Sequence, residues 1–120
     1  MPKKTKIQIP EYARKAVAYT RGEWLAEAKR RFGDDPMGWR FICPSCGHIA
    51  SVGDWKAAGA TEGEVAFSCV GRRMENSTEL GQAPGPCNYA GGGLFRLNPV
   101  TVTKDDGNTV DMFAFAEVAP

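Results

Sequence analysis

The sequence predicts a small single domain of the α+β class, with one long N-terminal helix and an antiparallel sheet pinned at four cysteines. Three observations predict this fold class. The chain has 120 residues, which is the size of one domain. A helix-capping motif precedes an amphipathic helical pattern, and alternating segments separated by a turn near the C-terminus are typical of antiparallel strands. The four cysteines include a close pair, which indicates a shared ligand site.

Residues 1–19 are expected to form a basic arm or extension ahead of a domain over residues 20–118. Lys6–Ile9 alternates well enough to add a strand to a sheet edge. Pro10 suits the first turn of a helix and Glu11 meets the helix dipole favourably, so a helix is expected to begin there. Its common face would carry Tyr12, Ala16 and Tyr19.

The long helix is predicted over Arg21–Phe32. Thr20 and Glu23 have the spacing of a capping box, in which each side chain accepts a hydrogen bond from the backbone amide of the other residue. Gly33 favours the end of the helix, and cations in the last turn interact favourably with the helix dipole. Apolar side chains recur at helical spacing on one face: Trp24, Leu25, Ala28 and Phe32.

Three shorter elements are predicted next. Trp39–Ile42 is expected to be a strand that leads into the first cysteine. Ser51 and Asp54 form a weaker variant of the capping box and predict a short helix over Val52–Ala58. Glu64–Cys69 alternates polar and apolar residues as a half-buried strand does, and would carry the third cysteine to the site. The aromatic residues expected in the core are Trp24, Trp39, Phe41, Trp55 and Phe67.

The C-terminal part is predicted to be a loop followed by strands. Residues 71–93 are rich in Gly, Pro, Asn and Ser, which predicts a long loop that Cys87 would tether. Strand character returns over residues 94–97, 100–103 and 109–116. The polar segment Lys104–Asn108 predicts a turn, so the last two strands are expected to form a hairpin.

Charge is distributed unevenly along the chain. Through Arg31 the sequence has nine basic and three acidic residues, whereas the remainder has six basic and eleven acidic residues. A basic segment can neutralise nucleic-acid phosphates and release counterions. It can equally be a solvated arm that leans on an acidic body, which is the more common role of such a charge run.

The membrane and secretory classes are not expected. No segment approaches the roughly 18 consecutive apolar residues that span a bilayer, and the first residues lack the apolar core of a signal peptide. We therefore expect a protein of the cytoplasm with no membrane partner. Because a reducing cytoplasm disfavours disulfides, clustered cysteines favour a metal site.

Cys43-Pro-Ser-Cys46-Gly47 is the most informative motif. Two thiolates two residues apart can bind one ion from a tight turn, and Gly47 can adopt the left-handed conformation that such a turn needs. This motif is similar to the knuckle of zinc ribbons and rubredoxins, although the long segment between the other two cysteines departs from a second C-x-x-C pair. Loop closure entropy grows slowly with length, so that segment can still return to the ion. The prediction is one structural zinc ion bound by Cys43, Cys46, Cys69 and Cys87.

Three alternatives to this site stay open. His48 lies two residues after Cys46 and is a candidate replacement for one cysteine. Iron also binds four thiolates, although the single knuckle favours zinc. In an oxidising compartment the four thiols would form two disulfides.

The protein is not expected to be an enzyme, because no set of acid, base and nucleophile is evident and a four-ligand metal leaves no position for a reacting water. The alternative, a cysteine-dependent enzyme, would place Cys69 beside the cations of Arg72 and Arg73. Tyr89, just after Cys87, is a candidate for partner contact; the other interpretation is that it packs over the metal loop.

The segments that carry the cysteines are Trp39–His48, Phe67–Arg72 and Gly85–Phe95. Together with the Trp24 helix, they resemble a family of small bacteriophage and prophage proteins that combine a zinc-ribbon-like knuckle with two further cysteines. The resemblance extends over residues 20–115. It implies a phage setting and a common fold, and it carries no mechanism.

Two functions of different class are predicted. The first is a non-enzymatic, zinc-binding phage accessory protein that acts as a protein-binding module on a host or phage protein. The alternative is a nucleic-acid-binding accessory protein. It would use the basic N-terminal segment for phosphate contacts, with stacking and further phosphate contacts from Arg72, Arg73 and Tyr89.

Overall fold

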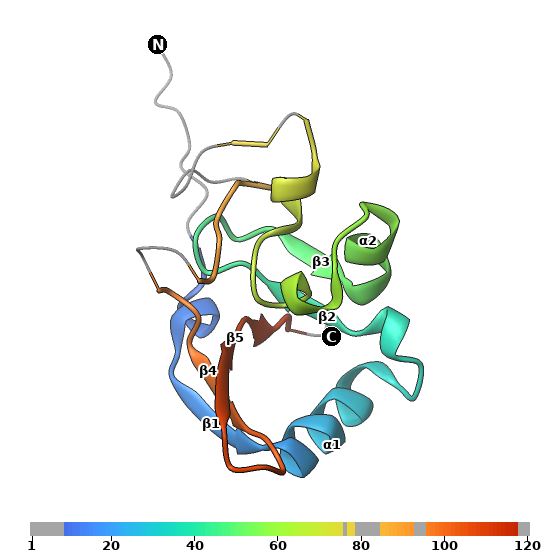
Figure 1. Cartoon of the computed structure of the whole chain (residues 1–120), viewed down its shortest axis with the longest axis vertical. Helices are drawn as coiled ribbons and strands as arrows, with labels where there is room; N and C mark the ends of the chain where they lie inside the picture. The colour runs from blue at the N-terminus through green and yellow to red at the C-terminus, as the bar shows by residue number, and fades with distance from the viewer. Residues whose placement is uncertain (1–8, 76, 79–84, 93–95, 118–120) are drawn as a thin grey trace.

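The computed structural model describes residues 9–75, 77–78, 85–92 and 96–117. Two three-stranded sheets organise this part of the chain (Figure 1). The first sheet has the order β1-β4-β5, with β1 at Val17–Thr20, β4 at Val100–Thr103 and β5 at Thr109–Met112. The second has the order β3-β2-β6, with β3 at Ile49–Ser51, β2 at Arg40–Ile42 and β6 at Ala114–Phe115.

The helices begin where the capping signals lie. Helix α1 spans Arg21–Phe32, and its capping box is formed by the Glu23 amide donating to Thr20 Oγ1 at 3.1 Å and the Thr20 amide donating to Glu23 Oε1 at 2.9 Å. Helix α2 spans Val52–Ala57. Short 3₁₀ helices are η1 at Glu11–Arg14, η2 at Pro36–Gly38, η3 at Glu62–Glu64 and η4 at Val70–Arg73. The described helices are all too short or too polar to cross a membrane.

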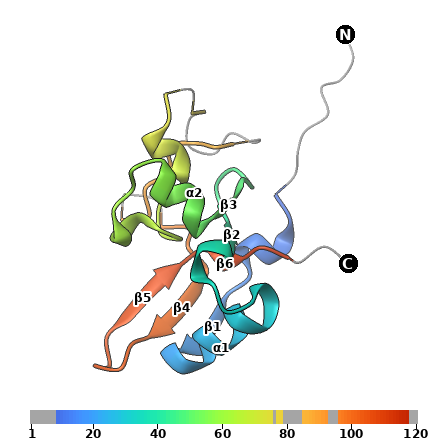
Figure 2. The same cartoon turned by 90° about the vertical axis from the view of Figure 1, so that its right-hand side faces the viewer.

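The elements are layered along the long axis. The β1-β4-β5 sheet and α1 lie at one end, α2 with η3 and η4 at the other, and β2 and β6 between them (Figures 1 and 2). An aromatic cluster joins α1 to the middle layer: the Trp24 ring stacks 6.0 Å from Phe41 and 5.5 Å from Phe115. Because aromatic side chains bury large apolar areas, this cluster is a main source of packing energy.

The α+β class is confirmed, and so are α1, β4 and the β4–β5 hairpin. Of the aromatic residues expected in the core, Trp39, Phe41 and Trp55 are buried, whereas Trp24 and Phe67 are half-buried.

The helix expected from Pro10 is wrong. Only one 3₁₀ turn forms, and the chain then extends into β1, so the face expected to carry Tyr12, Ala16 and Tyr19 does not exist. Strand β1 pairs in parallel with β4. Pairing with so distant a strand outweighs the local helix signal, because the ladder satisfies the backbone of Val17–Thr20. Of the predicted strand Lys6–Ile9, residues 6–8 lie outside the described residues and Ile9 is not in a strand.

The prediction of a single antiparallel sheet is also wrong. The β1-β4-β5 sheet is mixed, and β1 precedes α1. The strand predicted over 109–116 divides at Phe113, whose amide donates to the Ala66 carbonyl at 2.7 Å. Strand β5 therefore pairs with β4, and β6 pairs with β2 in the other sheet.

The strand predicted over Glu64–Cys69 is wrong. The amides of Phe67 and Ser68 both donate to the Glu64 carbonyl, at 3.1 and 3.0 Å, so the chain turns instead of extending. Ala66 has φ of +57°, a left-handed conformation that nothing in the local sequence predicts. In the predicted strand over 94–97, residues 94–95 lie outside the described residues and residues 96–97 are not in a strand.

Candidate metal centre

The knuckle lies at the turn of the β2–β3 hairpin. Strand β2 delivers Cys43, whose amide donates to the His48 carbonyl at 2.9 Å, and the Gly47 amide donates to the Cys43 carbonyl at 2.9 Å. Gly47 has φ of +80°, as the motif predicts. The turn thereby holds the sulfurs of Cys43 and Cys46 on one side.

The second pair of cysteines comes from two separate segments. Cys69 immediately precedes η4, and its amide donates to the Tyr89 carbonyl at 2.9 Å. The Cys87 amide donates to the sulfur of Cys69 at 3.4 Å, and the Tyr89 amide donates to the sulfur of Cys87 at 3.4 Å. The two segments are therefore joined by one backbone–backbone hydrogen bond and one amide-to-sulfur hydrogen bond, neither of which involves a metal.

All four sulfurs converge. They lie within 4.8 Å of one another, with 3.8 Å between Cys46 and Cys69 and 4.0 Å between Cys43 and Cys87. Four ligands about 2.3 Å from one ion at tetrahedral angles stand ~3.8 Å apart, so the donor set fits a zinc-sized ion. All four cysteines are free, so no two of these sulfurs are joined in a disulfide in this structure.

The cluster is closed to solvent. Each of the four cysteines has at most 3% of its surface exposed. Buried thiols with four protein ligands leave a bound ion no open position for water. The geometry therefore suits a structural ion.

Hydrogen bonds among the thiols shift their pKa values in opposite directions. Hydrogen bonding with Cys43 and then with Cys46 lowers the pKa of both Cys69 and Cys87. Hydrogen bonding with Cys46, and then with Cys69 and Cys87, raises the pKa of Cys43. A cation at the centre would favour the thiolate form of all four.

His48 does not join the cluster. The group of possible ligands that the described residues bring together consists of the four cysteines alone. His48 is half-buried in the hairpin turn, and desolvation lowers its pKa. The alternative in which His48 replaces a cysteine is not the arrangement in the structure.

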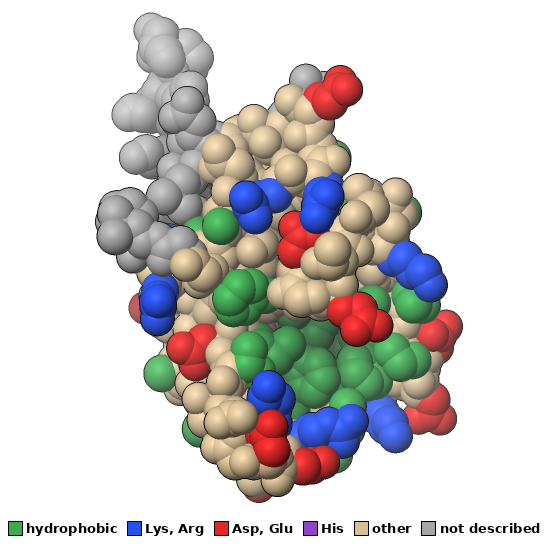
Figure 3. Space-filling model, viewed as in Figure 1, with side chains coloured by type: hydrophobic (Ala, Val, Ile, Leu, Met, Phe, Trp, Pro, Cys, Tyr) green, Lys and Arg blue, Asp and Glu red, His purple; other side chains and the backbone are tan. Residues whose placement is uncertain are grey.

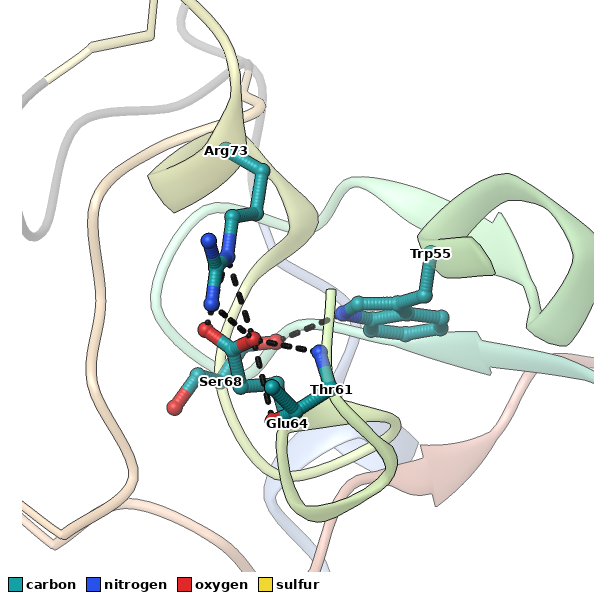
Figure 4. Close-up of polar contacts among 5 residues, drawn as sticks. All are labelled: Trp55, Thr61, Glu64, Ser68 and Arg73. Carbon is teal, nitrogen blue, oxygen red and sulfur yellow. Dashed lines mark hydrogen bonds and ion pairs between the residues drawn. The ribbon is translucent and has the colours of Figure 1, made fainter. Parts of the chain in front are cut away.

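A polar network supports the segment that leads into Cys69 (Figure 4). The Glu64 carboxylate accepts from the Thr61 amide at 2.7 Å, which caps η3, and from the Arg73 guanidinium at 2.7 Å, which joins η3 to η4. The hydrogen bond from Arg73 lowers the pKa of Glu64 to about 2. Trp55 Nε1 donates to the Ser68 carbonyl at 2.9 Å, which ties the same segment to α2.

Two residues named from the sequence have other roles. Tyr89 is 1% exposed, and its hydroxyl accepts a hydrogen bond from the Leu97 amide at 2.7 Å. The prediction that Tyr89 contacts a partner is therefore wrong, and the interpretation that it packs over the metal loop is confirmed. Arg73, expected near the thiol of Cys69 in the enzyme alternative, forms its ion pair with Glu64.

Sequence reasoning missed the contribution of the N-terminal segment to the knuckle. Arg14 Nε donates to the Pro44 carbonyl at 2.7 Å, and an Ile9 side-chain carbon lies 3.6 Å from where a Gly47 β-carbon would be. The positive charge of Arg14 was visible in the sequence, but its target depends on the tertiary fold. Ser68 was missed too: its hydroxyl accepts from the Gly91 amide at 3.0 Å, and no motif predicts this contact.

Searches of the curated proteins and of the solved structures found no match. The family model described as VVA0879-like matches residues 20–116, and the chain therefore belongs to the VVA0879-like family.

Proposed function

We propose that Cys43, Cys46, Cys69 and Cys87 bind one zinc ion that stabilises the fold of a non-enzymatic binding module. One observation carries this proposal: four buried sulfurs from three segments lie within 4.8 Å of one another. Hydrogen bonds among four neighbouring thiols stabilise the fold only weakly, whereas a thiophilic divalent ion can be coordinated by all four sulfurs.

Zinc is the proposed ion, with iron as its competitor. Zinc imposes no geometry of its own beyond the tetrahedron that the sulfurs already approach. The two metals are distinguished by metal analysis together with the visible spectrum, because iron bound to four thiolates is coloured and zinc is not. A stoichiometric, colourless zinc protein supports the proposal, and a coloured iron protein contradicts the choice of metal.

The proposed activity is protein binding. An ion with four protein ligands has no open position at which a reaction could take place. The function would therefore depend on the protein surface whose fold the ion stabilises. Figure 3 shows hydrophobic side chains gathered on one hollowed face between α1 and β5. The half-buried apolar residues of these two elements are Trp24, Leu25, Phe32, Val110 and Met112. Following the sequence resemblance, we propose that the partner is a host or phage protein.

The test is saturable capture of a partner protein from host-cell lysate by the zinc-loaded protein. Capture is compared between two matched variants at neighbouring positions of β5. Val110→Lys places a charge on the apolar face, whereas Thr109→Lys places it at an exposed position of the same strand. The proposal expects one partner that is retained by wild type and Thr109→Lys and lost with Val110→Lys. Absence of a saturable partner, or equal retention by both variants, contradicts it.

Nucleic-acid binding is the weaker proposal. Four arginines in the described chain are already ion-paired: Arg21 with Asp105, Arg30 and Arg31 with Glu27, and Arg73 with Glu64. A guanidinium group that is already paired with a carboxylate binds a phosphate less strongly than a free one. The lysines at positions 3, 4 and 6 lie outside the described residues. A gel shift at low salt that weakens steeply as salt rises would favour this alternative.

A further inference from the structure

Gly85 lies directly against a ligand sulfur. A β-carbon at this position would overlap Cys46 Sγ, and it would lie 3.0 Å from Cys46 Cβ and 3.1 Å from the Cys87 nitrogen. A side chain of any kind would therefore have to displace the sulfur or the backbone that carries the fourth cysteine.

Gly71 lies directly against the backbone of the fourth cysteine. A β-carbon here would overlap the Cys87 carbonyl oxygen and lie 2.7 Å from the Cys87 nitrogen. That same nitrogen donates to the sulfur of Cys69. Helix η4 and the Cys87 segment can thus approach at backbone distance only because position 71 has no side chain.

Backbone conformation does not explain these two glycines. The described glycines with positive φ are Gly33, Gly47, Gly59 and Gly107, so neither Gly71 nor Gly85 needs the left-handed region. What both positions require is the absence of a β-carbon. This requirement separates them from Gly47, which serves the turn of the knuckle.

We infer that Gly71 and Gly85 are positioning residues for the metal, and that they replace the missing second C-x-x-C turn. In a knuckle the tight turn itself sets the distance between two sulfurs. Cys69 and Cys87 are 18 positions apart, so close approach at the two glycines places Cys87 instead: Gly71 lets η4 lie against the Cys87 backbone, and Gly85 lets the Cys87 segment lie against the Cys46 sulfur. This inference rests on the proposed metal site.

The test compares Gly85→Ala and Gly71→Ala with Gly63→Ala, whose β-carbon would meet nothing within 4 Å. Each protein is titrated with Co²⁺ and with Zn²⁺, and the thiolate-to-cobalt absorption is recorded. We expect zinc affinity to fall about 10- to 100-fold in the first two variants, as it does when groups that orient metal ligands are lost. The cobalt spectrum should also lose thiolate intensity, which a change in stability alone would not cause. Gly63→Ala should match wild type.

The outcomes separate the two claims. Wild type that binds neither metal overturns the proposed function, whereas Gly85→Ala and Gly71→Ala that bind like wild type overturn the positioning role. If Gly85→Ala does not fold, the change is repeated in a Cys46→Ala background, which lacks the obstructing sulfur. There the inference expects Gly85→Ala to cause little further loss of helicity, a readout that does not need all four ligands. A loss as large as in the Cys46-containing protein contradicts it.

Discussion

The sulfur of Cys46 lies 3.8 Å from the sulfur of Cys69, although the two residues are 23 positions apart in the chain. Two ligands of one tetrahedral zinc ion are separated by about this distance. The β2–β3 hairpin and the segment before η4 meet at this contact, so the two parts of the fold are expected to depend on the same ion.

Removal of the metal is expected to abolish the cooperative thermal transition of the segments around Cys69 and Cys87. Structural zinc contributes on the order of 10 to 16 kcal/mol, which is comparable to the roughly 5 to 15 kcal/mol that stabilises a whole domain. Circular dichroism melts with and without chelator measure this effect. Chelator already saturated with zinc is the control, and a melt that free chelator leaves unchanged would count against the prediction.

Thr20→Ala is expected to destabilise the protein by about 1 kcal/mol, because it removes the acceptor that Oγ1 offers to the Glu23 amide. Thr20→Ser keeps this acceptor and should remain close to wild type. Chemical denaturation of both zinc-loaded variants provides the measurement. Equal destabilisation by Ala and Ser would show that the cap is not the cause.

Glu27→Gln should destabilise α1 in a pH-dependent manner. Hydrogen bonds from Arg30 and Arg31 lower the pKa of Glu27 from 4.5 to about 2. Because the folded pKa is lowered, the contribution is fully present above pH 4.5 and is lost as the pH falls toward 2. We expect Glu27→Gln to cost about 0.5 kcal/mol at pH 7 and less at pH 3. A difference from wild type that stays constant with pH would contradict this assignment.

Arg14→Leu should accelerate the loss of zinc to a chelator. The Arg14 guanidinium donates to the Pro44 carbonyl at 2.7 Å, and the loss of this partly exposed, charge-assisted hydrogen bond should cost about 1 kcal/mol, or roughly fivefold in rate. Lys15→Leu removes the same charge from the neighbouring residue and should have a smaller effect. Equal rates for the two variants would mean that charge alone, and not the contact with the knuckle, is responsible.

Local signals explain what the sequence could predict. The capping boxes at Thr20 and Ser51, the turn over Lys104–Asn108 and the knuckle at Cys43 all depend on hydrogen bonds between residues a few positions apart. Their residue types therefore identify them without knowledge of the tertiary fold. The ligand set followed from counting, since the chain has only four cysteines.

Long-range contacts explain what the sequence could not predict. The parallel pairing of β1 with β4 joins Val17 to Val100, and the alternation in Glu64–Cys69 imitates a strand. In that segment the Phe113 amide donates a hydrogen bond to the Ala66 carbonyl and helps to hold Ala66 in a left-handed turn. Such contacts form only in the assembled fold, because tertiary packing overrides local propensity.

The most direct test of the metal site is native mass spectrometry of the wild type and of Cys87→Ser, each purified without added metal and then loaded with zinc. We predict one zinc ion in the wild type and a large loss of zinc in Cys87→Ser, because Cys87 supplies one of the four sulfurs. A wild type that binds no zinc, or a variant that binds zinc as well as wild type, would contradict the four-cysteine centre.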